Sequence, residues 1–303
     1  MDESIIIRKL NQYYGRKQVL SNVNLTVTTG MFGLLGRNGA GKTTLMRTMT
    51  TLLPMKEGSI TICGIPVDNA KEIRRIVGYL PQDFSVYPSM RVHEAMDYLG
   101  ILSGMDKKER KERGEFLLEK VNLAEHRDKK VKALSGGMRR RLGIAQALLN
   151  DPRVLIVDEP TAGLDPEERI RFRNLLGTEA RERIVILSTH IVGDIEAACE
   201  DIAVLNEGRV IFNGKVQELM ENARGKVYEA QVDSEELFKI KEEFTVTSTR
   251  VQGNKTEVRF LSGQGVSWAD SAAPNMEDAY MVCLCENNGN QKDKVIPGQG
   301  GGC

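Results

Sequence analysis

The sequence has no uninterrupted apolar stretch close to the roughly 18 residues that a membrane-spanning helix requires. Its first four residues (MDES) are acidic and lack the basic and then apolar profile of a secretory signal peptide. Both absences lead us to expect a cytoplasmic protein.

An excess of charge of either sign is also missing, because 42 Lys and Arg residues balance 42 Asp and Glu residues. Nothing in this composition draws the chain to nucleic acid or to an anionic membrane surface. With 303 residues, of which 41% are hydrophobic, the chain has the size of one large domain or of a large and a small one.

Cysteine is scarce, and its five positions are scattered. Cys63 and Cys199 lie in apolar runs, which favours small core residues over ligands. Cys283 and Cys285 have the wrong spacing for a zinc pair, and no histidine lies near them. Cys303 lacks the three following residues that a prenylation motif needs. We therefore expect no structural metal site.

A glycine-rich loop at residues 36–43 (GRNGAGKT) follows a short apolar strand at 31–35 and opens a helix expected at 42–53. Its glycines allow a tight turn whose N–H groups converge on phosphate oxygens. Lys42 adds a positive charge toward the β- and γ-phosphates, and Thr43 offers a hydroxyl to Mg²⁺. The predicted nucleotide-binding residues of this loop are Gly36, Arg37, Asn38, Gly39, Ala40, Gly41, Lys42, Thr43 and Thr44.

Two carboxylates, Asp158 and Glu159, follow an apolar strand at 154–157. A buried carboxylate is costly unless it meets a cation or hydrogen-bond donors. We therefore expect Asp158 to hold Mg²⁺ through water and Glu159 to orient and deprotonate the attacking water. A role limited to solvating the strand end fits less well with the phosphate loop upstream, although the sequence leaves open which carboxylate is the base.

Three further residues stand at positions that suit nucleotide chemistry. Gln82 follows a strand expected at 75–80, where its side chain can coordinate Mg²⁺ and contact the attacking water. His190 follows the apolar run 184–189, which favours a contact with the γ-phosphate. Tyr14 can stack on adenine, and the adjacent Tyr13 is an alternative that the sequence does not separate from it.

A second glycine motif, Leu134-Ser135-Gly136-Gly137, opens a basic helix between the phosphate loop and the paired carboxylates. It predicts a second phosphate-binding surface on the same chain. One nucleotide does not need two such surfaces from one subunit. We therefore expect two copies to face each other, each supplying Ser135, Gly136 and Gly137 to the other's nucleotide.

The predicted elements indicate an α/β fold. Alternation over residues 23–27 predicts a half-buried antiparallel strand, whereas the continuous apolar runs before Asp158 and His190 are typical of a parallel sheet covered on both faces. Charged, helix-rich sequence separates Gln82 from Asp158 and predicts an inserted helical subdomain.

In chain order, these motifs resemble those of the ATP-binding subunit of an ABC transporter. The resemblance covers about residues 1–220. It involves seven motifs, which are the six described above and the stretch Ala162-Gly163-Leu164-Asp165. It implies a P-loop NTPase core with a mixed sheet and an antiparallel β subdomain, and an ATPase that uses Mg²⁺. It also implies a head-to-tail dimer with a second copy or a close homologue. In this dimer Ser135–Gly137 act in trans, and Asp165 lies in the loop that communicates across the interface.

The expected domains follow from this resemblance and from composition. They are an ATPase domain at 1–222 with its helical subdomain at about 90–150, a small α/β accessory domain at 225–286, and a disordered tail at 287–303.

The variant of the family that this chain resembles most is the ABC-2 exporter type. Met138 stands where the family commonly has Gln, which we expect to matter little because Ser135 and the glycines contact phosphate. The stretch 274–278 (PNMED) matches a helix motif at the end of such subunits. This resemblance implies a peripheral subunit on the cytoplasmic face of the cell membrane that drives a separately encoded permease, for export. We expect Phe84 and Tyr87 to form the groove for the permease's cytoplasmic helix, unless they pack within the helical subdomain.

Two other functions compete with transport. ABC ATPases that act on ribosomes or DNA carry paired nucleotide domains or long coiled-coil or zinc insertions, and neither is present, so no nucleic acid is expected. A module that binds ATP without turnover is disfavoured by the presence of Glu159 and His190. The transported substrate is not encoded here, because its contacts lie in the permease.

Overall fold

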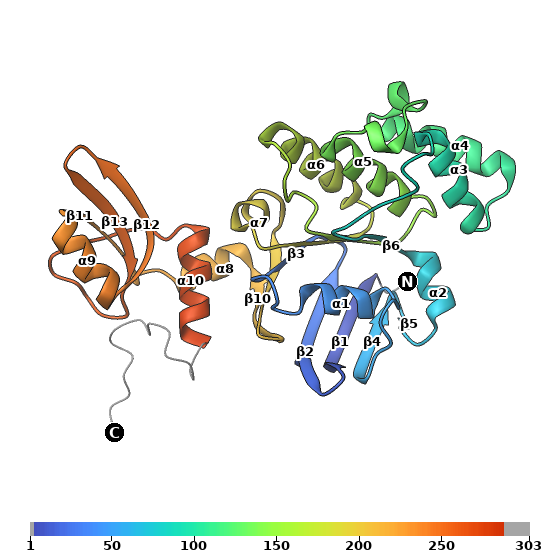
Figure 1. Cartoon of the computed structure of the whole chain (residues 1–303). Coiled ribbons are helices and arrows are strands. Elements are labelled where there is room, and N and C mark those ends of the chain that lie inside the picture. The colour runs from blue at the N-terminus through green and yellow to red at the C-terminus, as the bar shows by residue number, and fades with distance from the viewer. Residues whose placement is uncertain (1–2, 288–303) are drawn as a thin grey trace. The chain divides into compact units, whose positions relative to one another are not determined.

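The computed structural model describes residues 3–287 (Figure 1). These residues divide into two compact units, and the chain passes from one unit to the other more than once near residues 199–211. The first unit contains the chain up to Cys199 together with Ala203–Val210, and the second contains Glu200–Ile202 together with the chain from Ile211. The expected tail at 287–303 lies outside the described residues after its first position. Between residues 3 and 287, no helix is long and apolar enough to cross a membrane.

The largest sheet has six strands in the order β10-β9-β3-β8-β7-β6. Its strands are β3 (Gly30–Leu35), β6 (Val77–Leu80), β7 (Val154–Asp158), β8 (Ile184–Thr189), β9 (Asp201–Asn206) and β10 (Arg209–Lys215). Neighbouring pairs among β3, β8, β7 and β6 are parallel, and every residue of β7 and β8 is buried. Continuous apolar runs form these strands because both faces of the sheet are covered. The carboxyl ends of β3, β7 and β8 therefore meet at one edge.

A second, antiparallel sheet has the order β2-β1-β4-β5. Its strands are β1 (Ser4–Tyr14), β2 (Lys17–Thr28), β4 (Glu57–Ile62) and β5 (Ile65–Pro66). One apolar core joins it to the six-stranded sheet, with Leu10 and Leu25 from the first and Ile156 from the second. The mixed α/β architecture with an antiparallel β subdomain is thus confirmed.

The helices of the first unit are α1 (Lys42–Met49), α2 (Ala70–Ile76), α3 (Val92–Leu102), α4 (Lys107–Lys120), α5 (Gly136–Ala147), α6 (Pro166–Glu179) and α7 (Val192–Ala198). Short 3-10 turns lie at Ala124–His126 and Val131–Ala133. Helices α3, α4 and α5 follow one another between β6 and β7 and pack together, which makes them the inserted helical part (Figure 1). The charged helix α4 begins after Asp106, whose carboxylate accepts hydrogen bonds from the N–H groups of Lys108 and Glu109.

The ends of helices α1 and α2 differ from the sequence-based expectation. Helix α1 ends at Met49 rather than near Leu53, because Thr51 adopts a left-handed conformation (φ 60°) and turns the chain. The N–H groups of Leu52 and Leu53 then both bond the carbonyl of Arg47. Helix α2 extends to Ile76, so the strand expected at 75–80 begins only at Val77.

The second unit contains a four-stranded sheet in the order β12-β13-β11-β14. Its elements are α8 (Val216–Asn222), β11 (Val227–Val232), α9 (Ser234–Glu243), β12 (Thr245–Gln252), β13 (Lys255–Leu261), β14 (Asp270–Ser271) and α10 (Met276–Asn287). Helix α10 packs on α8, and a cluster around Phe260 lies between the sheet and α9. This unit therefore has its own apolar core.

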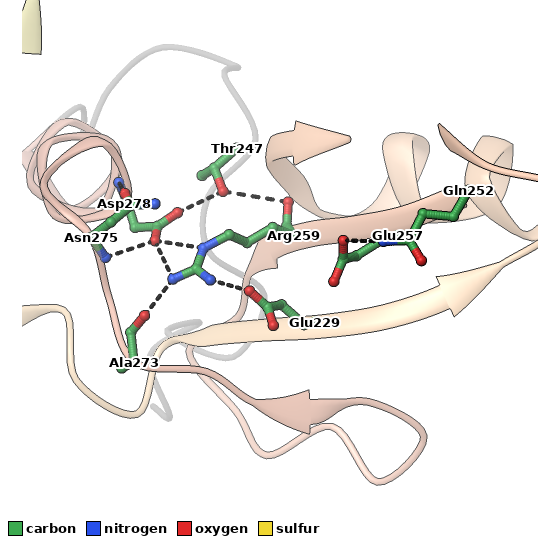
Figure 2. A network of polar contacts seen from close by, with 8 residues as sticks. All are labelled: Glu229, Thr247, Gln252, Glu257, Arg259, Ala273, Asn275 and Asp278. Atoms are coloured by element: carbon green, nitrogen blue, oxygen red, sulfur yellow. Dashed lines mark hydrogen bonds and ion pairs between the residues drawn. The ribbon is translucent and has the colours of Figure 1, made fainter. Parts of the chain in front are cut away.

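A polar network holds α10 to this sheet (Figure 2). Buried Asp278 accepts hydrogen bonds from Arg259 Nε at 2.7 Å and from Thr247 Oγ1 at 2.6 Å. It also forms a reciprocal helix cap with Asn275, in which each side chain accepts the other residue's N–H. The motif at 274–278 thus both starts α10 and anchors it.

Candidate functional site

The phosphate loop connects the end of β3 to the start of α1 and is shaped by glycine. Gly39 and Gly41 have positive φ angles of 84° and 108°, which side-chain-bearing residues rarely adopt. A Cβ atom on Gly36 would lie 2.4 Å from the carbonyl oxygen of Leu205. The loop exposes Arg37, Asn38 and Gly39, whereas Gly36, Ala40, Gly41, Lys42 and Thr44 are buried. This arrangement leaves the outer arc of the loop open to a phosphate chain.

Lys42 is the first residue of α1, and its ammonium group lies inside the site. Its Nζ donates hydrogen bonds to the carbonyl oxygens of Gly36 at 2.5 Å and Arg37 at 3.3 Å. The same atom lies 3.2 Å from Oε1 of Glu159. The lysine predicted to bind phosphate and the expected catalytic base are therefore an ion pair, both about 5% exposed.

Glu159 joins this pair to the end of β8. Its Oε2 lies 2.7 Å from Nδ1 of His190, and its own N–H donates to the carbonyl of Ser188. Glu159 has a φ of 47°, a strained conformation for a residue with a side chain. Such strain is common where a side chain must point in one direction for function. The structure thus brings together Lys42, Glu159 and His190, which come from the segments that follow three neighbouring strands, β3, β7 and β8.

Asp158, the last residue of β7, is fully buried beside this cluster. Its carboxylate accepts hydrogen bonds from Thr43 Oγ1 at 2.9 Å and from Ser188 Oγ at 3.1 Å. Burial raises the pKa of Asp158, and the two hydroxyl donors oppose that rise. Residues 3–287 contain no cluster of three His, Cys, Asp or Glu side chains that could hold a metal alone.

Ser135, Gly136 and Gly137 form a separate site at the start of α5. Ser135 caps the helix, with its Oγ accepting the N–H of Met138 at 3.2 Å. A Cβ on Gly136 would meet nothing within 4 Å, whereas one on Gly137 would lie 2.7 Å from Oε2 of Glu168. Within the described range, no hydrogen bond or ion pair joins these three residues to the cluster around Lys42.

The remaining predicted residues stand at the edges of the site. Gln82 is exposed two positions after β6. Tyr14 ends β1 and is 46% exposed, while Tyr13 is half-buried. Asp165 caps α6 through the N–H of Glu168. None of these side chains lies in the buried cluster itself.

Sequence reasoning missed Ser188. This residue lies directly opposite Asp158 in the parallel register of β7 and β8, and its hydroxyl bonds the carboxylate. The signal that finds it is a polar residue near the end of an otherwise apolar strand, two positions before His190.

Comparisons with known proteins agree with this geometry. Residues 20–162 match the family described as ABC transporter. The chain is 39% identical, over 72% of its length and 73% of the relative's, to Nod factor export ATP-binding protein I of Cupriavidus metallidurans. It is 28% identical to the structure of cbiO1 from Clostridium perfringens, part of the ABC transporter complex cbiONQ, with a TM-score of 0.67 over 73% of this chain and 92% of that one.

A second similar structure shows a cassette after ATP hydrolysis. It is a dimeric ATP-binding cassette, MJ0796, in a post-hydrolysis state bound to ADP and Pi. The two chains are 26% identical, with a TM-score of 0.63 over 70% of this chain and 98% of that one. The phosphate loop, the buried carboxylates and these relatives lead to one conclusion: the chain belongs to the ABC transporter family, as an ATP-binding and ATP-hydrolysing subunit.

Proposed function

We propose that two copies of this subunit, or one copy and a close homologue, form a head-to-tail dimer with two composite ATP sites. The observation that carries this proposal is the separation, on one chain, of the two surfaces that are predicted to bind phosphate. The cluster around Lys42 is one, and the open N-terminus of α5 at Ser135 and Gly136 is the other. Solved cassettes with the same fold are dimeric, which supports the arrangement.

The residues present fit a bound Mg²⁺. A hydroxyl from Thr43 and a carboxylate from Asp158 already lie in hydrogen-bond contact. Mg²⁺ prefers such oxygen ligands and usually completes its coordination with water and nucleotide phosphates. We assign Thr43, Asp158 and Gln82 to this ion. When bound, it would neutralise charge on the β- and γ-phosphates.

The protein's own part in hydrolysis centres on Glu159. In the ion pair, the carboxylate of Glu159 is bound to the ammonium group of Lys42, which is the group that would contact the phosphates. A nucleotide that takes Lys42 frees Glu159 to accept the proton of the attacking water. His190, already 2.7 Å from Glu159, is placed to contact the γ-phosphate on the same side. Tyr14 provides an exposed ring for the adenine.

The subunit lies peripherally on the cytoplasmic face of the membrane, where its partner is a separately encoded membrane permease, and the name of the similar Nod factor export protein supports export. A groove of about 350 Å³ lies between the end of α1 and helices α3 and α5. Leu52 and Leu102 line it and are 60% and 66% exposed. Exposed apolar side chains in a groove mark a protein contact, so we assign this groove to a cytoplasmic helix of the permease.

Phe84 and Tyr87, the residues expected to form the groove, have different surroundings. Phe84 is half-buried against α5, where a Cβ on Gly143 would lie 3.0 Å from its ring. Tyr87 is 58% exposed and packs edge-on against Tyr98 of α3. Phe84 thus packs within the helical part, whereas the exposed ring of Tyr87 remains available to contact the permease.

Copurification of the subunit with its membrane permease tests the assignment. Changing Leu52 and Leu102 together to Ser should abolish copurification while leaving the ATPase rate of the isolated subunit unchanged, because both side chains are exposed. Ile170→Ser on α6, where the side chain is 50% exposed, is the matched control. Normal assembly of the double variant would remove the groove from the interface.

A further inference from the structure

Arg140 connects helix α5 to the segment that carries Gln82. Its guanidinium NH1 donates to the main-chain oxygen of Pro81 at 3.3 Å and also to that of Gln82. Arg140 lies five residues after Ser135 on the same helix, about 7.5 Å along the axis. Helix α5 therefore carries Ser135 at its start and, further along, Arg140, which donates a hydrogen bond to the main chain of Gln82.

A second contact holds the same segment. Gly143, three residues after Arg140, lets α5 approach so closely that a Cβ there would lie 2.5 Å from Leu80 Cδ1 and 3.0 Å from the ring of Phe84. Residues three apart share one face of a helix. Gly143 thus lies against both ends of the stretch from Leu80 to Phe84, and Arg140 bonds its middle.

The charge of Arg140 lies in the field of the catalytic carboxylates. Burial lowers the pKa of Arg140, and Asp83, Asp158 and Glu159 oppose that decrease. An open cleft of about 240 Å³, lined by Gln82, Gly136 and Arg140 among others, lies beside the guanidinium. Arg140 is therefore close to both predicted phosphate-binding surfaces without belonging to the buried cluster around Lys42.

We propose that Arg140 is a positioning residue that holds the Gln82 main chain so that the Gln82 side chain meets the Mg²⁺ of the nucleotide. This inference rests on the proposed function of Gln82 and Ser135. Because α5 is rigid, a movement of Ser135 against the partner's nucleotide moves Arg140 as well. Arg140 in turn moves Gln82 at the ATP site of its own chain. One guanidinium nitrogen bonds both carbonyls, and its two N–H groups are fixed in the plane of the guanidinium, whereas the N–H groups of a lysine ammonium rotate.

The test measures the affinity of trinitrophenyl-ATP, a fluorescent ATP analogue, with and without Mg²⁺. Arg140→Met should keep the Mg²⁺-free affinity and lose most of the Mg²⁺-dependent gain, by about 10-fold if one ligand contact is lost. Arg140→Lys should lose less, since the positive charge and an N–H donor group remain, without the fixed planar geometry. Gln82→Ala should lose the same gain, and the double variant should lose no more than either alone, because both act through one contact.

The matched control is Arg171→Met on α6, which removes an exposed arginine bonded to Glu167 and Glu168 of its own helix. It should bind as the wild type does in both conditions. Three results would overturn the positioning role. Arg140→Met could bind the analogue equally weakly with and without Mg²⁺, or it could keep the full Mg²⁺-dependent gain in affinity of the wild type. The losses in the double variant could also prove additive. A wild-type protein without any Mg²⁺-dependent gain would instead overturn the proposed function, and this inference with it.

Discussion

At the scale of single residues, the site is held together by charges that satisfy one another. Lys42 and Glu159 are both buried, and each offsets the cost of removing the other from water. A nucleotide competes for Lys42 with a carboxylate that is already in place. A neutral residue at position 159 should therefore leave Lys42 at least as available to phosphate as it is beside the native carboxylate.

Glu159→Gln should abolish turnover and preserve ATP binding, because the amide keeps the shape of the side chain and cannot accept the proton. A lost general base lowers the rate by about 100-fold or more. Phosphate release measures the rate, and gel filtration with ATP should reveal a trapped dimer. The exposed carboxylate variant Glu182→Gln serves as control. Hydrolysis within a few-fold of wild type would exclude Glu159 as the base.

Asp158 is predicted to cost stability in exchange for metal binding. Burial raises its pKa in the folded protein, so its contribution to stability is fully present below the unfolded pKa of about 3.9 and is lost as the pH rises through the folded pKa. Asp158→Asn, uncharged at every pH, should raise the nucleotide-free melting temperature by a few degrees at pH 8 and by less at pH 5. Scanning fluorimetry measures this. A lower melting temperature at pH 8 would contradict the argument.

At the scale of elements, helix α10 depends on one buried carboxylate. Arg259→Met would leave Asp278 without its cation, which typically costs about 3–5 kcal/mol. Hydrogen exchange should then quicken in β11, β13 and α10 but not in β7 or β8, since each unit has its own core. Adding Asp278→Asn should restore part of the protection by removing the unpaired charge.

The control for this change lies on the same strand. Glu257 accepts a hydrogen bond from Gln252 at an exposed position (Figure 2). Glu257→Gln should change stability by less than about 0.5 kcal/mol, as surface substitutions usually do. Exchange in Arg259→Met as slow as in Glu257→Gln would show that the buried network does not stabilise the second unit.

Helices and strands were predictable from the sequence where one hydrophobic pattern persists along the whole element. The fully buried strands β7 and β8 read as continuous apolar runs, and the phosphate loop, both carboxylates and His190 follow such strands directly. Strand β1 was missed because its register shifts break the alternation and bury a polar residue, Gln12. The partners Ser188 and Arg140 depend on register and on tertiary contact, which local pattern does not encode.

At the scale of the whole molecule, the proposed dimer makes each ATP site depend on two chains. Ser135→Arg would place a cation and bulk at the open start of α5, where a Cβ on Gly136 meets nothing within 4 Å. This variant should bind ATP normally and fail to hydrolyse it, because its own phosphate loop is intact. Lys42→Ala should fail at the earlier step, since the phosphates lose their cation.

A mixture of these two inactive chains should regain activity. Each mixed dimer has one intact site, built from the phosphate loop of the Ser135→Arg chain and the Ser135–Gly137 surface of the Lys42→Ala chain. Random pairing in an equal mixture would restore up to about a quarter of the wild-type rate, because half of the dimers are mixed and each has one working site. Steady-state phosphate release, measured as the second chain is titrated into the first, checks this. If each chain used only its own residues, the mixture would stay as inactive as its components at every ratio, and the dimer with shared sites would have to be abandoned.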